Sequence, residues 1–166
     1  PVQHLAAILA GFDMNAVHVN QCSDDDLNLL ALTGTRVVYC PRASEYFGAQ
    51  EHFGPHRYRE MIERGICVAL GTDSIINLPA SEVRDEGLGL SPLAEARHLF
   101  RRDSADAGVL MRMMTTNGAA VLGEPESRVS LAEGAQPAGI IAIEAEPSVN
   151  PLVSVFESNA APEILV

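Results

Sequence analysis

The chain has 166 residues and a net charge of −11, and 47% of its residues are hydrophobic while 20% are charged. This length suffices for one domain with a substantial core, and the composition is globular rather than disordered. The negative charge argues against nucleic acid or an anionic membrane as partner, and three widely spaced cysteines favour a reducing, cytoplasmic compartment over a disulfide framework or a zinc knuckle.

The first elements alternate between helix and strand. Residues 2–9 are predicted to form a helix, and residues 14–19 a strand that ends at His18. Ser23 is predicted to cap the next helix, because residues 24–26 are three aspartates that would meet the positive end of the helix dipole. Three adjacent aspartates also suggest a metal cluster, but their place in a first turn favours the capping role.

A second strand, over residues 36–39, is followed by a proline that ends its ladder pairing. Residues 43–56 are then predicted to form an irregular loop. We expect it to line a substrate pocket, since loops on a rigid scaffold carry function. The alternative is that its aromatic groups only cover the rim of the sheet. The aromatic and imidazole residues of this loop are Tyr46, Phe47, His52, Phe53 and His56.

The third strand is the most informative part of the sequence. Residues 67–70 form a short apolar run after a predicted helix over residues 57–64, and Gly71 lets the backbone turn before Asp73. A carboxylate at the C-terminal end of a buried parallel strand is where β/α-barrel enzymes place their catalytic groups. The alternative is that Asp73 is a helix cap or a turn residue. His18 also ends a strand, and the two side chains can converge only if both strands end at the same edge of one sheet. We expect both strands to belong to one parallel sheet and both side chains to lie at its C-terminal edge.

The remaining sequence predicts a second long loop and then three helices. The loop covers residues 74–90. The first helix begins at the Ser91-Pro92 pair and covers residues 92–100, and the next two helices cover residues 105–114 and 116–122. Residues 140–143 are predicted to form a buried strand. The clustered methionines are predicted to pack in the core rather than to hold a metal or cofactor; they are Met111, Met113 and Met114.

Three segments in order resemble a known family. AVHVN, VVYCPRAS and VALGTDS are similar to the last three barrel strands of the amidohydrolase superfamily, in the branch of guanine deaminase, cytosine deaminase-like enzymes and triazine chlorohydrolases. His18 matches the histidine that ends the sixth strand, and residues 71–73 match the Gly-Thr-Asp that ends the eighth. Residues 40–44 match only loosely the Cys-Pro-x-Ser segment often carried by the seventh strand, because two residues separate the proline from the serine. MRMMTTNGAAVLG and SRVSLAEGAQPAGIIAIE resemble the closing helix and the return into a small β domain.

The resemblance implies an α/β fold that is the C-terminal portion of a TIM-type (β/α)8 barrel, with its last three strands and helices. Residues 1–125 would be this part of the barrel, and residues 126–166 the return toward a small β-sandwich domain. A closed barrel needs about 250 residues. The chain begins at Pro1 without an initiator methionine. We therefore expect it to be the C-terminal part of a larger enzyme.

The chain departs from the family pattern at several positions. The His-x-His pair that binds metal on the first strand of the family does not occur here. The histidine often found before Cys-Pro is Tyr39, and the asparagine that commonly follows the serine is Glu45. The resemblance therefore implies that part of the metal site lies outside this chain.

The function implied by the resemblance is metal-dependent hydrolysis of a C–N bond (deamination or amide hydrolysis) or a C–Cl bond in a small, heterocyclic substrate. A divalent metal, zinc or iron, would lower the pKa of the attacking water. The resemblance makes Asp73 both a metal ligand and a proton shuttle, and makes His18 an electrostatic stabiliser. The candidates for substrate contacts are Tyr39, Arg42, His52 and His56.

One carboxylate cannot hold a zinc ion, because such sites need three or more protein ligands. We therefore expect this chain by itself to be inactive. The partners expected are a small-molecule substrate, the missing N-terminal part of the barrel and further copies in a homo-oligomer, and neither nucleic acid nor a membrane. The alternative is an inert barrel fragment that serves as an assembly or interaction module, since an open sheet edge favours pairing with another chain.

Overall fold

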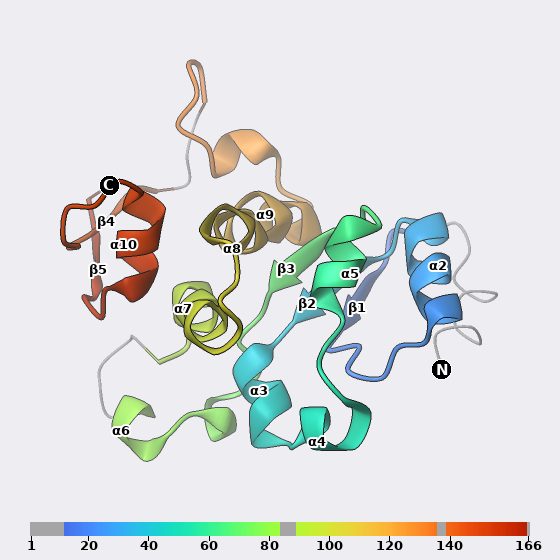
Figure 1. Ribbon diagram of the computed structural model, residues 1–166. Helices are drawn as coiled ribbons and strands as arrows, with labels where there is room; N and C mark the ends of the chain where they lie inside the picture. Colours follow the sequence, from blue (N-terminus) through green and yellow to red (C-terminus); the bar gives the residue numbers. More distant parts are fainter. Residues whose placement is uncertain (1–11, 84–88, 136–138, 166) are drawn as a thin grey trace.

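The computed structural model describes residues 12–83, 89–135 and 139–165, which form two small sheets surrounded by helices (Figure 1). The helix predicted over residues 2–9 lies outside the described residues.

The central sheet consists of three short parallel strands, which lie in the order β1-β2-β3. Parallel strands require crossover connections, and helices supply them here. Because all three strands run the same way, they end at one edge of the sheet, as the sequence predicts for an α/β fold. The elements are β1 (Asn15–Val17), α2 (Asp24–Thr33), β2 (Arg36–Tyr39), α3 (Pro41–Tyr46), α4 (Ala49–Phe53), α5 (Tyr58–Glu63) and β3 (Val68–Leu70).

The acidic first turn of α2 is a helix cap, as predicted. The Ser23 hydroxyl accepts a hydrogen bond from the Asp26 N–H at 3.2 Å, and the Asp26 carboxylate accepts one from the Ser23 N–H at 3.0 Å. This reciprocal pair is a capping box. At the other end, Gly34 adopts the left-handed conformation (φ 65°) that closes a helix.

The core lies between the central sheet and the helices. Val37 and Tyr39 on the central strand β2 and Val68 on β3 are fully buried on this side. Helices contribute the other fully or almost fully buried side chains: Leu27, Leu30, Met61, Leu99, Leu110, Met113 and Phe156. The predicted core role of the methionines is confirmed, because Met113 is fully buried and Met111 and Met114 pack against the cluster.

The second half of the chain adds a helical layer and a separate sheet. Helix α10 packs against α7 and α8, and in Figure 1 β4, β5 and α10 lie on the far side of α7 and α8 from the central sheet. Strands β4 and β5 pair antiparallel. The elements are η1 (Ile75–Asn77), α6 (Ala80–Val83), α7 (Pro92–Asp103), α8 (Ala107–Met114), α9 (Thr116–Leu122), η2 (Glu126–Arg128), β4 (Ile141–Ile143), α10 (Pro151–Glu157) and β5 (Pro162–Ile164). Within the three described ranges, no helix has the length and apolar character needed to cross a membrane.

Three predictions from the sequence are wrong in part. Residues 43–56 are not an irregular loop, because most of them belong to α3 and α4, which Gly48 separates at φ 63°. Pro41 ends β2 but also starts α3, since proline is favoured at the first helical position. The loop over residues 74–90 contains η1 and α6, and its residues 84–88 lie outside the described part. Strand β4 is not buried, because it belongs to a two-stranded sheet, and Ile141 is 52% exposed.

Gly71 occupies a position where a side chain does not fit. A Cβ atom there would lie 2.6 Å from Val38 Cγ1 and 3.0 Å from Cys40 Sγ. We expect Gly71→Ala to lower the free energy of unfolding by about 1–3 kcal/mol, the usual cost of overpacking, in urea denaturation. Gly118→Ala in α9 is the matched control, because the nearest atom to its Cβ would be a backbone oxygen at 4.0 Å. Similar losses in both variants would contradict a specific clash at Gly71.

Candidate active site

The ends of β1 and β3 bring His18 and Asp73 together. His18 Nε2 lies 3.7 Å from Asp73 Oδ2, and the two side chains are 41% and 31% exposed. Strand β2 lies between β1 and β3, so the pair meets across the C-terminal end of β2. The expectation that both side chains lie at one edge of one sheet is confirmed.

Both strand ends have a rarely used backbone conformation. The φ angles of His18, Val19 and Asp73 are 67°, 51° and 57°. Residues other than glycine seldom adopt this left-handed region, and a β-branched residue such as Val19 does so least readily. Such conformations cost about 1–3 kcal/mol each and concentrate at functional sites. Three of the four non-glycine residues with positive φ in the described ranges thus lie at these two strand ends, and the fourth is Ser104 at the end of α7.

His56 holds the turn that carries His18. Its Nε2–H donates a hydrogen bond to the His18 carbonyl at 2.7 Å, and because a carbonyl only accepts, the ring proton must lie on Nε2. The ring is buried, and its Nδ1 has no hydrogen-bond partner among the described residues. Burial lowers the pKa of His56 to about 4. The imidazole is therefore neutral at neutral pH.

Tyr39 supports His56 from within the core. The two rings stack with centroids 3.7 Å apart and an angle of 12° between their planes. The Tyr39 hydroxyl accepts a hydrogen bond from Arg102 at 3.1 Å, and burial raises the pKa of this phenol. Tyr58 stacks on the Tyr39 ring at 5.6 Å.

Arg42 ties α3 to α7. Its Nε donates to Glu95 Oε1 at 2.7 Å, and its backbone N–H donates to Glu95 Oε2 at 3.1 Å. The Glu95 side chain is fully buried, and that of Arg42 is 9% exposed. Arg42 also donates through Nη2 to the Gly89 carbonyl at 2.5 Å. The pair fixes the segment after β2 against the start of α7.

Tyr39, Arg42 and His56 thus have internal partners, whereas His52 is exposed on α4 beside Phe53. Of these four, His56 hydrogen-bonds the His18 turn, and it does so through the backbone carbonyl of His18. Substrate contact by any of the four remains a prediction.

Two contributors to this region were not predicted. Ser44 donates to Asn20 Oδ1 at 2.7 Å and so links the segment after β1 to α3. No local pattern signals this bond between residues far apart in the chain. The role of Glu95 was also not predicted. The signal for it was a carboxylate among the apolar residues on the buried face of α7, which indicates a buried positively charged partner.

Cys40 lies next to the turn that carries Asp73, since its Sγ would be 3.0 Å from a Cβ at Gly71. Burial raises the pKa of Cys40 to about 12, so the group stays a neutral thiol. With 2% of its surface exposed, Cys40 is a small core residue.

The burial of neutral His56 makes stability depend on pH. Its pKa is about 4 in the folded protein against an ordinary value of 6.5. Between pH 6.5 and pH 4 the unfolded chain therefore binds more protons at His56 than the folded protein does. The free energy of unfolding falls as the pH drops through this range. We expect His56 to account for a loss of about 2 kcal/mol between pH 7.5 and pH 5 in urea denaturation. Burial also lowers the pKa of His98, so His56→Gln should reduce this pH dependence without abolishing it. An unchanged dependence in His56→Gln would contradict a buried neutral ring.

Asp73 offers a carboxylate to a metal site, and the His18 imidazole lies beside it. Their separation of 3.7 Å and their partial exposure fit two groups that face a common ion or water. Across the described ranges, no cluster of three or more His, Cys, Asp or Glu side chains could hold a metal ion. A complete zinc site needs at least three protein ligands. The described residues therefore fit part of a metal site.

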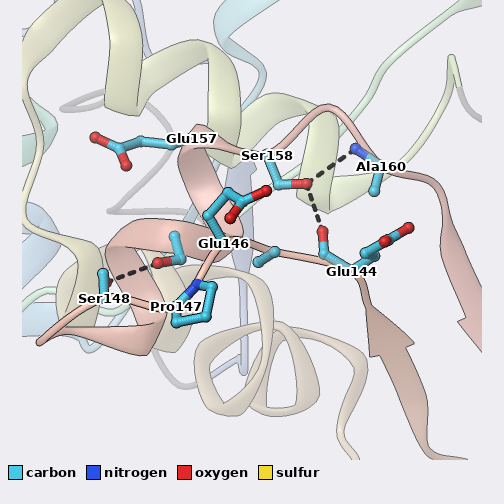
Figure 2. Close-up of a pocket in the computed structure, with 9 residues that line it drawn as sticks. Glu144, Glu146, Pro147, Ser148, Glu157, Ser158 and Ala160 are labelled. Carbon is cyan, nitrogen blue, oxygen red and sulfur yellow. Dashed lines mark hydrogen bonds between the residues drawn. The ribbon is translucent and has the colours of Figure 1, made fainter.

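A separate acidic hollow of about 670 Å³ lies in the C-terminal part of the chain (Figure 2). The Ser158 hydroxyl donates to the Glu144 carbonyl at 2.7 Å, and the hydroxyls of Ser148 and Ser154 share a hydrogen bond at 2.7 Å. Figure 2 shows the carboxylates of Glu144, Glu146 and Glu157 pointing in different directions. They do not converge on a common point, so this hollow does not resemble a cation site.

Comparison with known proteins gives consistent matches. The sequence model of the Amidohydrolase family matches residues 8–164. Among curated relatives, a 5-methylthioadenosine/S-adenosylhomocysteine deaminase of Teredinibacter turnerae is 33% identical over 132 residues, which are 78% of this chain and 28% of the relative. A deaminase of the same name from Symbiobacterium thermophilum is 29% identical over 164 residues, 94% of this chain and 35% of the relative.

Solved structures show the same fold. An adenosine deaminase from Xanthomonas campestris with bound zinc matches with a TM-score of 0.65 and 22% identity, over 89% of this chain and 33% of that one. E. coli guanine deaminase matches with a TM-score of 0.52 and 18% identity, over 68% of this chain and 25% of that one. This chain thus spans between a quarter and just over a third of the length of these proteins.

Proposed function

Because this chain belongs to the amidohydrolase family, we propose that it is part of a metal-dependent hydrolase that removes an amino group from a small heterocyclic substrate. The observation that carries the proposal is the approach of His18 to Asp73 at the C-terminal edge of the parallel sheet. Deamination is favoured over amide or C–Cl hydrolysis because the curated relatives are deaminases.

The proposed reaction forms a C–O bond to the attacking water and breaks the C–N bond to the leaving amino group. A divalent metal, zinc or iron, would supply a lowered water pKa, and Asp73 would be one of its ligands. Asp73 takes a proton from the water and delivers it to the leaving nitrogen. His18 hydrogen-bonds the attacking water or the charge that develops on the substrate. The His18 and Asp73 side chains already lie beside each other in the fold, which reduces the entropy lost in orienting them for the reaction.

The remaining metal ligands are proposed to come from an N-terminal part of the barrel that this chain does not include. The edge strand β1 is proposed to pair with that part through its outer backbone groups. Exposed apolar side chains support contact there, since Val17 of β1 is 54% exposed and Phe12, just before β1, is 68% exposed. Residues 126–166 are proposed to belong to a small β domain, a view supported by the separate sheet of β4 and β5. The cytoplasmic location and the homo-oligomer remain predictions.

The decisive experiment combines metal analysis with a substrate screen on the full-length protein. Ammonia release would be measured with 5′-methylthioadenosine, S-adenosylhomocysteine, adenosine and guanine. We expect turnover of at least one of them, loss of turnover after chelation, and recovery with added zinc or iron. Metal binding without any ammonia release would contradict deamination. Absence of both metal and turnover would support the inert interaction module instead.

A further inference from the structure

We propose that His56 is a positioning residue for this reaction, because it fixes the left-handed turn through which His18 faces Asp73. The proposal rests on the proposed function for its catalytic meaning, while the hydrogen bond itself can be tested without any activity.

The first argument is that both polar groups of the His18 backbone are tied. Its N–H donates to the Val38 carbonyl at 2.8 Å, which continues the pairing of β1 with β2. Its carbonyl accepts from His56 Nε2 at 2.7 Å. The backbone of His18 is therefore held from two sides, and its side chain is left to face Asp73.

The second argument is that the held conformation is intrinsically unfavourable. His18 and Val19 are consecutive residues with φ angles of 67° and 51°. A strained turn persists only where its surroundings determine it strongly. The partly buried hydrogen bond from His56 to the central carbonyl of this turn is such a determinant, since an alternative backbone would leave the donor of the buried His56 ring without this partner.

The third argument is that His56 is itself immobilised. It stacks on Tyr39 of β2, and the Tyr39 hydroxyl is held by Arg102. The position of His56 is thus coupled to the strand that lies between β1 and β3. With 8% of its surface exposed, His56 acts through His18 rather than by contact with the substrate.

The test uses two substitutions in the full-length enzyme. His56→Gln retains an amide N–H near the position of Nε2, whereas His56→Leu fills similar space without a donor. We expect His56→Leu to lower kcat by roughly 10- to 100-fold, since small misplacements of catalytic groups have effects of that size. KM and metal content should stay near their wild-type values, and His56→Gln should restore most of kcat. Equal losses of kcat in the Gln and Leu variants would overturn the proposal.

Tyr58→Leu is the matched control for loss of packing. Tyr58 stacks on Tyr39 and lies beside His56, with ring centroids 6.3 Å apart, but it makes no contact with the His18 carbonyl. It should lower stability while kcat of the folded enzyme stays unchanged. A loss of kcat as large as that of His56→Leu would indicate that general packing, and not the hydrogen bond, controls activity.

A double-mutant cycle with His18→Ala separates positioning from a merely structural role. If His56 acts through His18, then His56→Leu has little further effect on kcat once the imidazole of His18 is absent. The same fold-loss in both backgrounds would overturn the proposal.

Selective ¹⁵N-histidine NMR of the full-length protein tests the hydrogen bond independently. His56 should show a protonated Nε2 and an unprotonated Nδ1 at neutral pH, and the opposite tautomer would overturn the proposal. If the wild-type protein has no turnover, the proposed function fails and His56 has no catalytic meaning, but the NMR result still decides whether His56 holds the turn.

Discussion

Asp73→Asn is expected to lower kcat of the full-length enzyme by roughly 10²-fold or more, the usual scale for loss of a general acid–base group. The amide keeps the shape of the carboxylate but cannot accept a proton. Asparagine also tolerates the left-handed backbone well, so the φ of 57° at this position should be retained. Steady-state kinetics, together with a melting temperature close to that of the wild type, would assign the loss to chemistry rather than to folding.

His18→Ala is the informative comparison. It should also lower kcat, but it should leave metal content nearly intact, because His18 is proposed to contact water or substrate. Loss of metal in His18→Ala would make His18 a ligand instead. Near-normal turnover in Asp73→Asn would mean that Asp73 is only a turn residue.

Glu95→Ala is expected to lower the free energy of unfolding by about 3–5 kcal/mol, because removing one member of a buried ion pair leaves the other charge in a poorly solvated site. The Glu95 side chain is fully buried and holds both the guanidinium and the backbone N–H of Arg42. Urea denaturation at neutral pH would measure the loss.

Glu124→Ala provides the matched control. Glu124 lies 3.9 Å from Arg128, and both side chains are at least half exposed. Exposed pairs of this kind usually contribute less than about 1 kcal/mol. A loss for Glu95→Ala no larger than that for Glu124→Ala would contradict the view that the Arg42–Glu95 pair anchors α3 to α7.

Much of the local structure could be predicted from the sequence, because its signals lie within a few residues of the element they define. Ser23 and the aspartates after it specify the start of α2, and Gly34 specifies its end. Helix α9 begins and ends at the predicted residues, since Gly123 adopts a left-handed conformation directly after it. The short apolar runs of the central strands were predicted for the same reason.

Where local signals conflict, the prediction failed. Pro41 both stops a strand and favours a helix start, and the sequence alone did not decide between a loop and α3. Residues 140–143 are apolar, which favoured a buried strand. Burial depends on what packs against a strand, and Ile141 is exposed because its sheet has only two strands.

The sequence predicted the candidate site as two strand ends at one edge of one sheet. The sequence determined that His18 and Asp73 each follow a short strand, since an apolar run and the residue after it are adjacent in the chain. Only the tertiary structure decided that these side chains lie 3.7 Å apart, that His56 holds the backbone of His18, and that Arg42 pairs with Glu95. These contacts join residues 38 to 55 positions apart. His18 meets Asp73 because parallel pairing places the ends of β1, β2 and β3 at one edge, and Arg42 meets Glu95 because α3 packs against α7. No pattern of neighbouring residues contains that information, because strand order and helix packing are properties of the folded chain.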